Sequence, residues 1–177
     1  MRANAKRFRI SPDTIGTLGG SSGAHMALLV ALTDDRDLEG AGGNNDVSSQ
    51  VQAVAAMAAP TDLRRLDASG RSVVARFLHV SPEQNPKLWA RASLVNHVRV
   101  GGPSILLIDG TSDAAVLPEQ SSQFAELYRK AVGHVELVLL PKAPQPFWNY
   151  TPWFEDTMNR ASRFFHRVAN QAKQTEP

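Results

Sequence analysis

A serine between glycines is the residue of this sequence best suited to covalent chemistry. It lies in the pentapeptide Gly19-Gly20-Ser21-Ser22-Gly23, which has the form G-x-S-x-G. Where a strand leads directly into a helix, this motif forms a nucleophile elbow, a tight turn that requires small neighbours and raises the serine hydroxyl above the strand end. The backbone N–H of Ser22 would then donate to the oxyanion formed when Ser21 attacks an acyl group. The motif predicts acyl transfer to a serine.

A glycine-rich turn between a strand and a helix can also bind phosphate. A dinucleotide fingerprint requires G-x-G-x-x-G, and the glycines at positions 16, 19, 20 and 23 do not fit that spacing. A nucleotide-binding domain would also need a ribose-binding carboxylate after the second strand. The nearby candidate, Asp62, lies in a Pro-Thr-Asp turn, which weakens the nucleotide interpretation and favours the elbow.

The stretches around the motif must provide that strand and helix. An apolar run precedes it at residues 14–18, and an Ala/Leu-rich segment follows at 22–32. Further apolar runs alternate with helix-like segments in the order 51–58, 104–109, 118–131, 135–140 and 153–172. This alternation is typical of parallel strands joined by crossover helices. We predict an α/β fold, a parallel sheet of about four strands with helices on both faces.

Three further expectations concern burial and connections. The runs 104–109 and 135–140 are continuous enough to be strands buried on both faces. Residues 34–50 are crowded with Asp, Gly, Asn and Ser, which predicts a long surface loop. Residues 72–94 predict two short helices, interrupted around Pro82 and Pro86.

A serine nucleophile needs a general base, and the base needs an orienting carboxylate. Two aspartates, Asp109 and Asp113, follow the third apolar run. Asp109 lies at the strand end, and Asp113 lies in the loop beyond it. Asp113 could instead be a loop carboxylate that caps the helix starting near Pro118.

These motifs together resemble the α/β-hydrolase esterases, in particular small carboxylesterases and carbohydrate-ester hydrolases. The likeness lies in the serine motif followed by Ala24-His25, in the Pro60-Thr61-Asp62 turn, and in the Leu-Leu-Ile-x-Gly pattern at 106–110. In that family the acid follows the last of these patterns, which implies Asp113. The resemblance covers nearly the whole chain and implies ester hydrolysis without a cofactor.

One departure from the family concerns the base. The family places its histidine in a segment of the type Pro-x-Ala-Pro-His-x-Phe-Trp, and here residues 141–148 read Pro-Lys-Ala-Pro-Gln-Pro-Phe-Trp. Gln145 therefore occupies the base position. Its amide can hydrogen-bond Ser21 but cannot take a proton, so general-base catalysis of roughly 10²–10⁴-fold would be missing.

No other histidine is an evident substitute for the base. His25 matches a family position that packs rather than catalyses, and His79 cannot be placed. Three more lie away from the expected strand ends, and all five suit structural or surface roles better: His25, His79, His97, His134 and His166.

The second departure is the absence of the family's first four strands and of its His-Gly-Gly-Gly-type oxyanion loop. We therefore expect one truncated domain over residues 1–172 and a disordered tail over 173–177. The strand at 14–18 would have an open edge. That edge predicts a homodimer or domain-swapped pair built on it, or else an aggregation-prone fragment.

Composition excludes several classes of protein. The 177 residues carry a formal charge of +2 and no cysteine, so nucleic-acid binding is not implied and thiol chemistry is excluded. The basic residues at positions 2, 6, 7 and 9 fit a solvated helix face better than a phosphate-binding arm. No apolar run reaches the roughly 18 residues of a membrane span, and no signal-peptide core is present. We expect a cytoplasmic protein as written, although a longer parent could be secreted.

The combined prediction is a serine esterase for short-chain or carbohydrate esters, impaired by Gln145 and independent of metal or other cofactors. The alternative is a non-catalytic, hydrolase-like binding or assembly protein. The sequence gives little information on which residues line the substrate pocket. An aromatic cluster beside the base segment could line it, although such clusters more often belong to the core: Phe147, Trp148, Tyr150 and Trp153.

Overall fold

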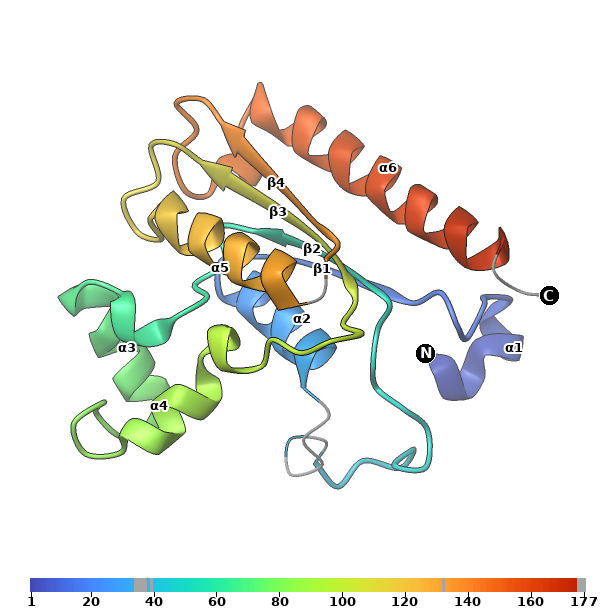
Figure 1. The fold of residues 1–177 in the computed structure, drawn as a ribbon, viewed down its shortest axis with the longest axis horizontal. Coiled ribbons are helices and arrows are strands. Elements are labelled where there is room, and N and C mark those ends of the chain that lie inside the picture. Colours follow the sequence, from blue (N-terminus) through green and yellow to red (C-terminus); the bar gives the residue numbers. More distant parts are fainter. Residues whose placement is uncertain (34–37, 39, 132, 175–177) are drawn as a thin grey trace.

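The computed structural model describes residues 1–33, 38, 40–131 and 133–174. Its centre is a parallel sheet in the order β1-β2-β3-β4, so each strand pairs with its neighbour in sequence (Figure 1). The strands are β1 (Gly16–Gly20), β2 (Ala53–Met57), β3 (Ser104–Gly110) and β4 (Val135–Leu140). The predicted four-strand parallel sheet is confirmed, with β1 beginning and ending two residues later than expected.

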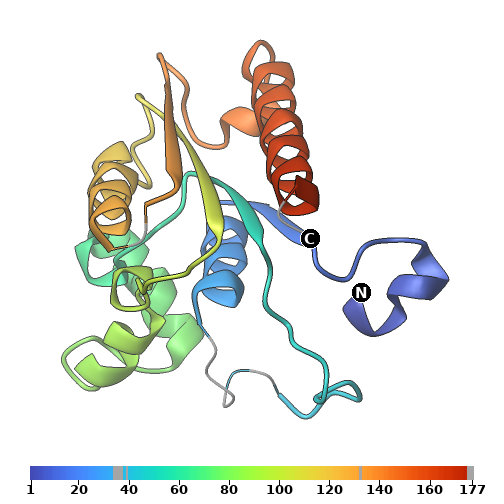
Figure 2. The ribbon, with the colours of Figure 1, turned by 45° about the vertical axis from the view of Figure 1, so that its right-hand side comes forward.

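Helices cover both faces of the sheet, as predicted. Helices α2 (Ser22–Leu32) and α5 (Pro118–Ala131) pack on one face, and α6 (Trp153–Gln174) packs on the other (Figures 1 and 2). Alternate residues of β2 and β3 supply the two cores, because successive side chains of a strand point to opposite faces. Val54 and Ile105 face α2 and α5, whereas Ala55 and Leu106 face α6.

The two inner strands are buried on both sides, but β4 is not. Every residue of β2 is buried, as is β3 apart from its first residue. In β4 only the first and last residues are buried, and Leu139 is 44% exposed. The expectation that 135–140 is buried on both faces is therefore wrong. The reason is position, because β4 is an edge strand in the observed order.

A small helical segment connects β2 to β3. It contains the 3₁₀ turns η3 (Leu63–Arg65) and η4 (Leu94–Asn96) and the helices α3 (Ala68–Leu78) and α4 (Pro86–Ala92). The two expected helices are present, but Pro86 starts α4 rather than interrupting a helix. At the first helical position a proline loses no intrahelical bond, and the Asn85 side chain caps the turn by accepting from the Leu88 N–H.

The chain ends lie at the periphery. The N-terminal segment forms η1 (Arg2–Asn4) and the short helix α1 (Ala5–Phe8). The Arg2 side chain donates to the carbonyls of Pro12 at 2.8 Å and Gln50 at 2.7 Å, which ties this segment to the irregular stretch before β2. Of the loop expected at 34–50, residues 40–50 are irregular, and 34–37 and 39 lie outside the described residues.

At the other end, α6 continues to Gln174, so residues 173 and 174 of the expected tail are helical. Residues 175–177 lie outside the part of the chain that the structure describes. Within that part, no helix combines the length and apolar character needed to cross a membrane.

Helix α6 permits a matched test of the packing. Phe164 is fully buried against the sheet, and Phe154 on the same helix is 49% exposed. We expect Phe164→Ala to lower the free energy of unfolding by about 3–5 kcal/mol, because the substitution removes buried apolar surface and leaves a cavity. Phe154→Ala should change it by no more than about 0.5 kcal/mol. Urea unfolding followed by circular dichroism measures both, and equal losses would contradict the observed packing of α6.

Candidate active site

Ser21 lies at the junction between β1 and α2, in a strained backbone conformation. Its φ is 55° and its ψ is −121°, a region that residues with a side chain rarely occupy. The Ser21 N–H donates to the Met57 carbonyl at 2.8 Å, which fixes the turn to the end of β2. This is the geometry of a nucleophile elbow, with the strand, the turn and the helix in the required order.

Close packing around the turn explains two of its glycines. A Cβ at Gly19 would lie 2.3 Å from the Gly23 carbonyl oxygen, and a Cβ at Gly20 would lie 2.6 Å from the Trp148 ring. A Cβ at Gly23 itself would meet no atom within 4 Å among the described residues outside the adjacent backbone of its own helix. Positions 19 and 20 therefore have no room for a side chain. At Gly23 the close contact is made by its backbone carbonyl, which lies against Gly19.

Gln145 reaches Ser21 from the loop after β4, 124 residues further along the chain. Its Nε2 donates a hydrogen bond to Ser21 Oγ at 2.9 Å. The structure thus brings together Gln145 and Ser21, the residues predicted for the base position and the nucleophile. The direction of this bond matters, because a working base accepts the serine proton whereas this amide occupies a lone pair of Oγ.

Asp113 is held in the loop between β3 and α5. Its Oδ1 accepts from the backbone N–H groups of Ala115 at 2.8 Å and Val116 at 2.9 Å. These bonds stabilise the loop and do not cap α5, because that helix begins only at Pro118. Asp113 Oδ2 is buried and has no hydrogen-bond partner among the residues that the structure describes. A buried acceptor without a donor costs roughly 1–3 kcal/mol, and a histidine N–H is the group that a triad acid would accept from.

A second carboxyl, Asp109, is buried at the end of β3. Neither of its oxygens has a hydrogen-bond partner within the described part of the chain. Burial raises the pKa of Asp109 from an ordinary 3.8 to about 7, and the charge of nearby Asp113 adds to the rise. The Ser121 hydroxyl acts in the opposite direction and offsets part of the rise in the pKa of Asp109. Asp109 is therefore largely protonated below neutral pH, which does not suit a triad acid.

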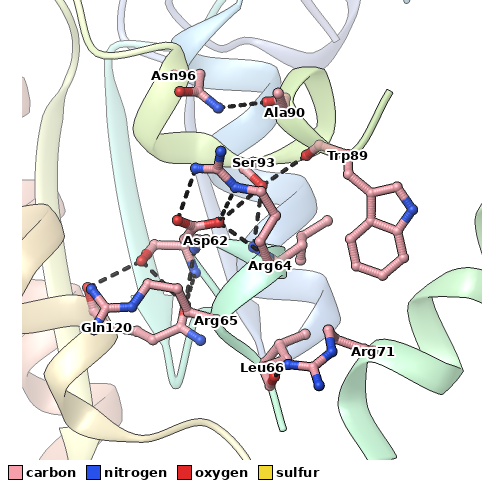
Figure 3. A network of polar contacts seen from close by, with 12 residues as sticks. Asp62, Arg64, Arg65, Leu66, Arg71, Trp89, Ala90, Ser93, Asn96 and Gln120 are labelled. Atoms are coloured by element: carbon pink, nitrogen blue, oxygen red, sulfur yellow. Dashed lines mark hydrogen bonds and ion pairs between the residues drawn. The ribbon is translucent and has the colours of Figure 1, made fainter. Parts of the chain in front are cut away.

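The turn after β2 anchors the start of α5 (Figure 3). Gln120 Oε1 accepts from the N–H groups of Thr61 and Asp62, both at 2.9 Å, and the Thr61 hydroxyl donates to the Gln120 carbonyl at 3.0 Å. Asp62 is itself occupied, because Arg64 donates to both of its carboxylate oxygens at 2.9 Å. Partial burial works to raise the pKa of Asp62, but the bonds from Arg64 outweigh it and lower that pKa. The carboxylate proposed for a ribose thus has a structural role.

The histidines have roles elsewhere. His25 is buried in α2, and its Nδ1 lies 2.8 Å from the Pro60 carbonyl oxygen. Burial lowers the pKa of His25, which favours the neutral ring in this packing position. His97 contacts the Arg91 carbonyl, and His134 lies 3.8 Å from Glu136. Among the described contacts of Ser21 Oγ, none is to a histidine.

Most of the aromatic cluster belongs to the core. Phe147 is fully buried, and Trp148 and Trp153 pack against the same cluster under α6. Tyr150 is the exposed member. Sequence reasoning left open whether these rings line a pocket, and the close approach of Trp148 to Gly20 gives that ring a role in shaping the elbow. Within the described residues, no three His, Asp or Glu side chains are grouped so as to hold a metal ion.

The packing at the elbow gives a prediction for the two outer glycines of the motif. Gly19→Ala should lower the free energy of unfolding by roughly 1–3 kcal/mol, because the new methyl would meet backbone atoms that cannot move aside easily. Gly23→Ala should raise it by about 0.5–1 kcal/mol, since alanine is favoured in a helix. Thermal unfolding of both variants measures the difference. Equal effects would mean that β1 and α2 do not approach as described.

Asp109 gives a pH prediction. Because its pKa is raised in the folded state, its contribution to stability is complete below about pH 4 and is lost as the pH rises toward 7. Relative to Asp109→Asn, which does not titrate, the wild type should lose roughly 4 kcal/mol of unfolding free energy over this range. Urea titrations at pH 4, 5, 6, 7 and 8 on both proteins test this. Parallel pH profiles would show that Asp109 is not a buried neutral acid.

Comparison with known proteins agrees with this geometry. A family model described as BD-FAE matches residues 1–128. The esterase LipQ of Mycobacterium tuberculosis is 29% identical over 153 residues, which are 83% of this chain and 36% of LipQ. The chain thus spans about a third of the length of this curated relative.

Solved structures extend the likeness to most of the described fold. A truncated form of a carbohydrate esterase from gut microbiota superposes with a TM-score of 0.81 at 26% identity, covering 96% of this chain and 64% of that one. The apo form of Thermogutta terrifontis esterase 2 gives a TM-score of 0.79 at 26% identity, covering 94% and 60%. The chain belongs to the BD-FAE family, and its sheet and helices form part of the α/β-hydrolase fold of esterases.

Proposed function

We propose that this chain is a serine carboxylesterase of low activity, in which Ser21 forms an acyl intermediate with a short-chain or carbohydrate ester. The observation that carries the proposal is Ser21 itself, strained above the end of β1 and in contact with Gln145. Strain of this kind persists only where the surrounding structure imposes it, and it is typical of functional sites.

The chemistry follows from the groups around Ser21. Its Oγ attacks the ester carbonyl, the bond from the acyl carbon to the alcohol oxygen breaks, and water later hydrolyses the acyl-serine. The Ser22 N–H stands at the start of α2, where it can donate to the oxyanion. The serine proton must leave to solvent, and the departing alkoxide must take up a proton from solvent, because Gln145 donates to Oγ and has no basic nitrogen.

Asp113 is the proposed acid, but none of the described contacts connects it to Ser21. Its Oδ2 accepts no hydrogen bond from the described residues, Gln145 included. Enzymes that lose a triad member retain roughly 10³–10⁴-fold catalysis over water through their oxyanion hole and substrate binding. One oxyanion donor contributes roughly 10²–10³-fold of such catalysis. We therefore expect this chain to hydrolyse esters at a rate near the lower limit of detection.

The substrate class is proposed from relatives of similar fold. One is named a carbohydrate esterase, and structures of Thermogutta terrifontis esterase 2 hold propionate and butyrate. A small acyl group fits the proposal because Trp148 packs directly on Gly20 beside the nucleophile. The proposed partner is thus a small-molecule ester, with no nucleic acid or membrane involved.

A second candidate function is a non-catalytic, hydrolase-like binding or assembly protein. The direction of the hydrogen bond from Gln145 to Ser21 favours it, because the amide donates to Oγ and offers no acceptor for the serine proton. A site of this kind would bind an ester or its acid without turning it over. Covalent chemistry at Ser21 distinguishes the two functions.

The decisive variant is Gln145→His. A histidine at this position can accept the Ser21 proton and donate to the free Asp113 oxygen, so we expect kcat/KM for p-nitrophenyl butyrate to rise by roughly 10²–10⁴-fold. The gain should fall with protonation of the new imidazole near pH 6.5. The double variant with Ser21→Ala should return to the buffer rate, and Gln145→Asn should show no gain.

Labelling of Ser21 provides a control that does not require turnover. Paraoxon phosphorylates a reactive serine, and mass spectrometry would detect the adduct on Ser21 in Gln145→His and, more slowly, in the wild type. A folded Gln145→His protein that neither hydrolyses the ester nor forms the adduct would contradict the esterase proposal and support the binding function.

A further inference from the structure

The loop after β3 and the loop after β4 are joined side by side where the two strands end. Gly110 and Leu140 form the last pair of these strands. Beyond it, the Thr111 N–H donates to the Leu140 carbonyl at 3.0 Å, and the Ser112 N–H donates to the Ala143 carbonyl at 3.1 Å. The ladder of hydrogen bonds therefore continues past the sheet and connects the two loops.

These two loops carry the predicted acid and the residue in the base position. Asp113 directly follows Ser112, and Gln145 lies two residues after Ala143. The approach of the loops is close, because a Cβ at Gly110 would clash with the backbone carbonyl of Ala143. The position of residue 145 therefore depends on the loop after β3 as well as on its own strand.

One side chain takes part in this junction. The Thr111 hydroxyl oxygen accepts a hydrogen bond from the backbone N–H of Lys142 at 2.9 Å, across 31 residues of sequence. Among the hydrogen bonds described between the two loops, this is the one made by a side chain, and the others join backbone groups. A substitution at position 111 can therefore remove this bond and leave the backbone ladder in place.

The bond holds Lys142 in a turn that suits glycine better. Residues 140–143 form a turn that is closed by a bond from the Ala143 N–H to the Leu140 carbonyl at 3.3 Å, with Pro141 at its second position. Lys142, at the third position, has a φ of 58°. Proline followed by a residue with positive φ is typical of a type II turn, in which glycine or asparagine usually occupies the third position. The strain of a lysine there persists only where the surrounding structure imposes it.

We propose that Thr111 is a positioning residue, whose hydroxyl fixes the turn at Lys142 and thereby sets the residue at position 145 against Ser21. Gln145 lies three residues after Lys142, and its Nε2 is 2.9 Å from Ser21 Oγ. A different turn at Lys142 would displace residue 145 from this contact. A displacement of about 1 Å can cost about 100-fold in rate. The proposal rests on the esterase function proposed above, in which position 145 must reach Ser21.

The contact between Gln145 and Ser21 can be measured without any turnover. In the wild type, nuclear magnetic resonance should show a nuclear Overhauser effect between the Gln145 Nε2 protons and the Ser21 Cβ protons, because Nε2 lies 2.9 Å from Oγ. Thr111→Val keeps the shape of the side chain but removes the acceptor, so we expect it to weaken this effect in folded molecules. Thr111→Ser keeps the hydroxyl and should preserve the effect.

Thr157→Val is the matched control. The Thr157 hydroxyl is buried in α6 and has no hydrogen-bond partner among the described residues, so its removal should leave the Overhauser effect unchanged. An effect of wild-type strength in folded Thr111→Val would overturn the proposal. So would its absence from the wild type, or an equal loss in Thr111→Ser.

Kinetics separate this proposal from the esterase function itself. In the Gln145→His background, adding Thr111→Val should lower kcat for p-nitrophenyl butyrate by roughly 5- to 100-fold with KM unchanged, because the change affects the reacting groups and not substrate binding. Thr111→Ser should restore kcat. An unchanged kcat, or a loss that serine does not restore, would overturn the role of Thr111. If Gln145→His is inactive, the esterase function fails, and the Overhauser effect still decides whether Thr111 positions residue 145.

Discussion

The close approach of β1 to α2 is the constraint on which the candidate site depends. Gly19 lies so near the backbone of Gly23 that a side chain cannot fit between them, so the strand must turn into the helix at Ser21. Ser21 makes this turn with a positive φ of 55°. The Trp148 ring closes over Gly20, which brings the loop after β4 to the turn and Gln145 to Ser21.

The hydrogen bonds at this site run in an unusual direction. In a serine triad, the serine donates to the base and the base donates to the acid, so that a proton can move along the chain of groups. Here Ser21 Oγ accepts from Gln145, and Asp113 Oδ2 accepts from no described residue. The fold is that of part of an α/β-hydrolase, but the hydrogen bond at Gln145 runs opposite to that of a triad base. The neighbouring Asp109 does not suit the role of triad acid either, because burial keeps it neutral at moderately acidic pH.

Local sequence patterns predicted most of the fold. The bounds of α2, α5 and β4 agree with the expected ranges, because alternating apolar runs and helical spacing depend on neighbours in sequence. The exposure of β4 could not be foreseen in this way, since it depends on strand order rather than on the residues of the strand. Gln145 and Asp113 were singled out only through the family resemblance. The contact across 124 residues and the unpaired Asp113 oxygen required coordinates. Asp109 had a visible signal, a carboxylate within an apolar strand, but its burial was not predictable from that alone.

The anchoring of α5 by Gln120 has a consequence for how the molecule opens. This one side chain bonds to both Thr61 and Asp62, and Asp62 is joined to Ser93 and Arg64 in the segment between β2 and β3. The loop that carries Asp113 ends where α5 begins, only a few residues before Gln120. Regions tied together in this way tend to open in concert. Amide hydrogens of the α3–α4 segment and of the Asp113 loop should therefore exchange as one cooperative unit, separate from the slower strands of the sheet.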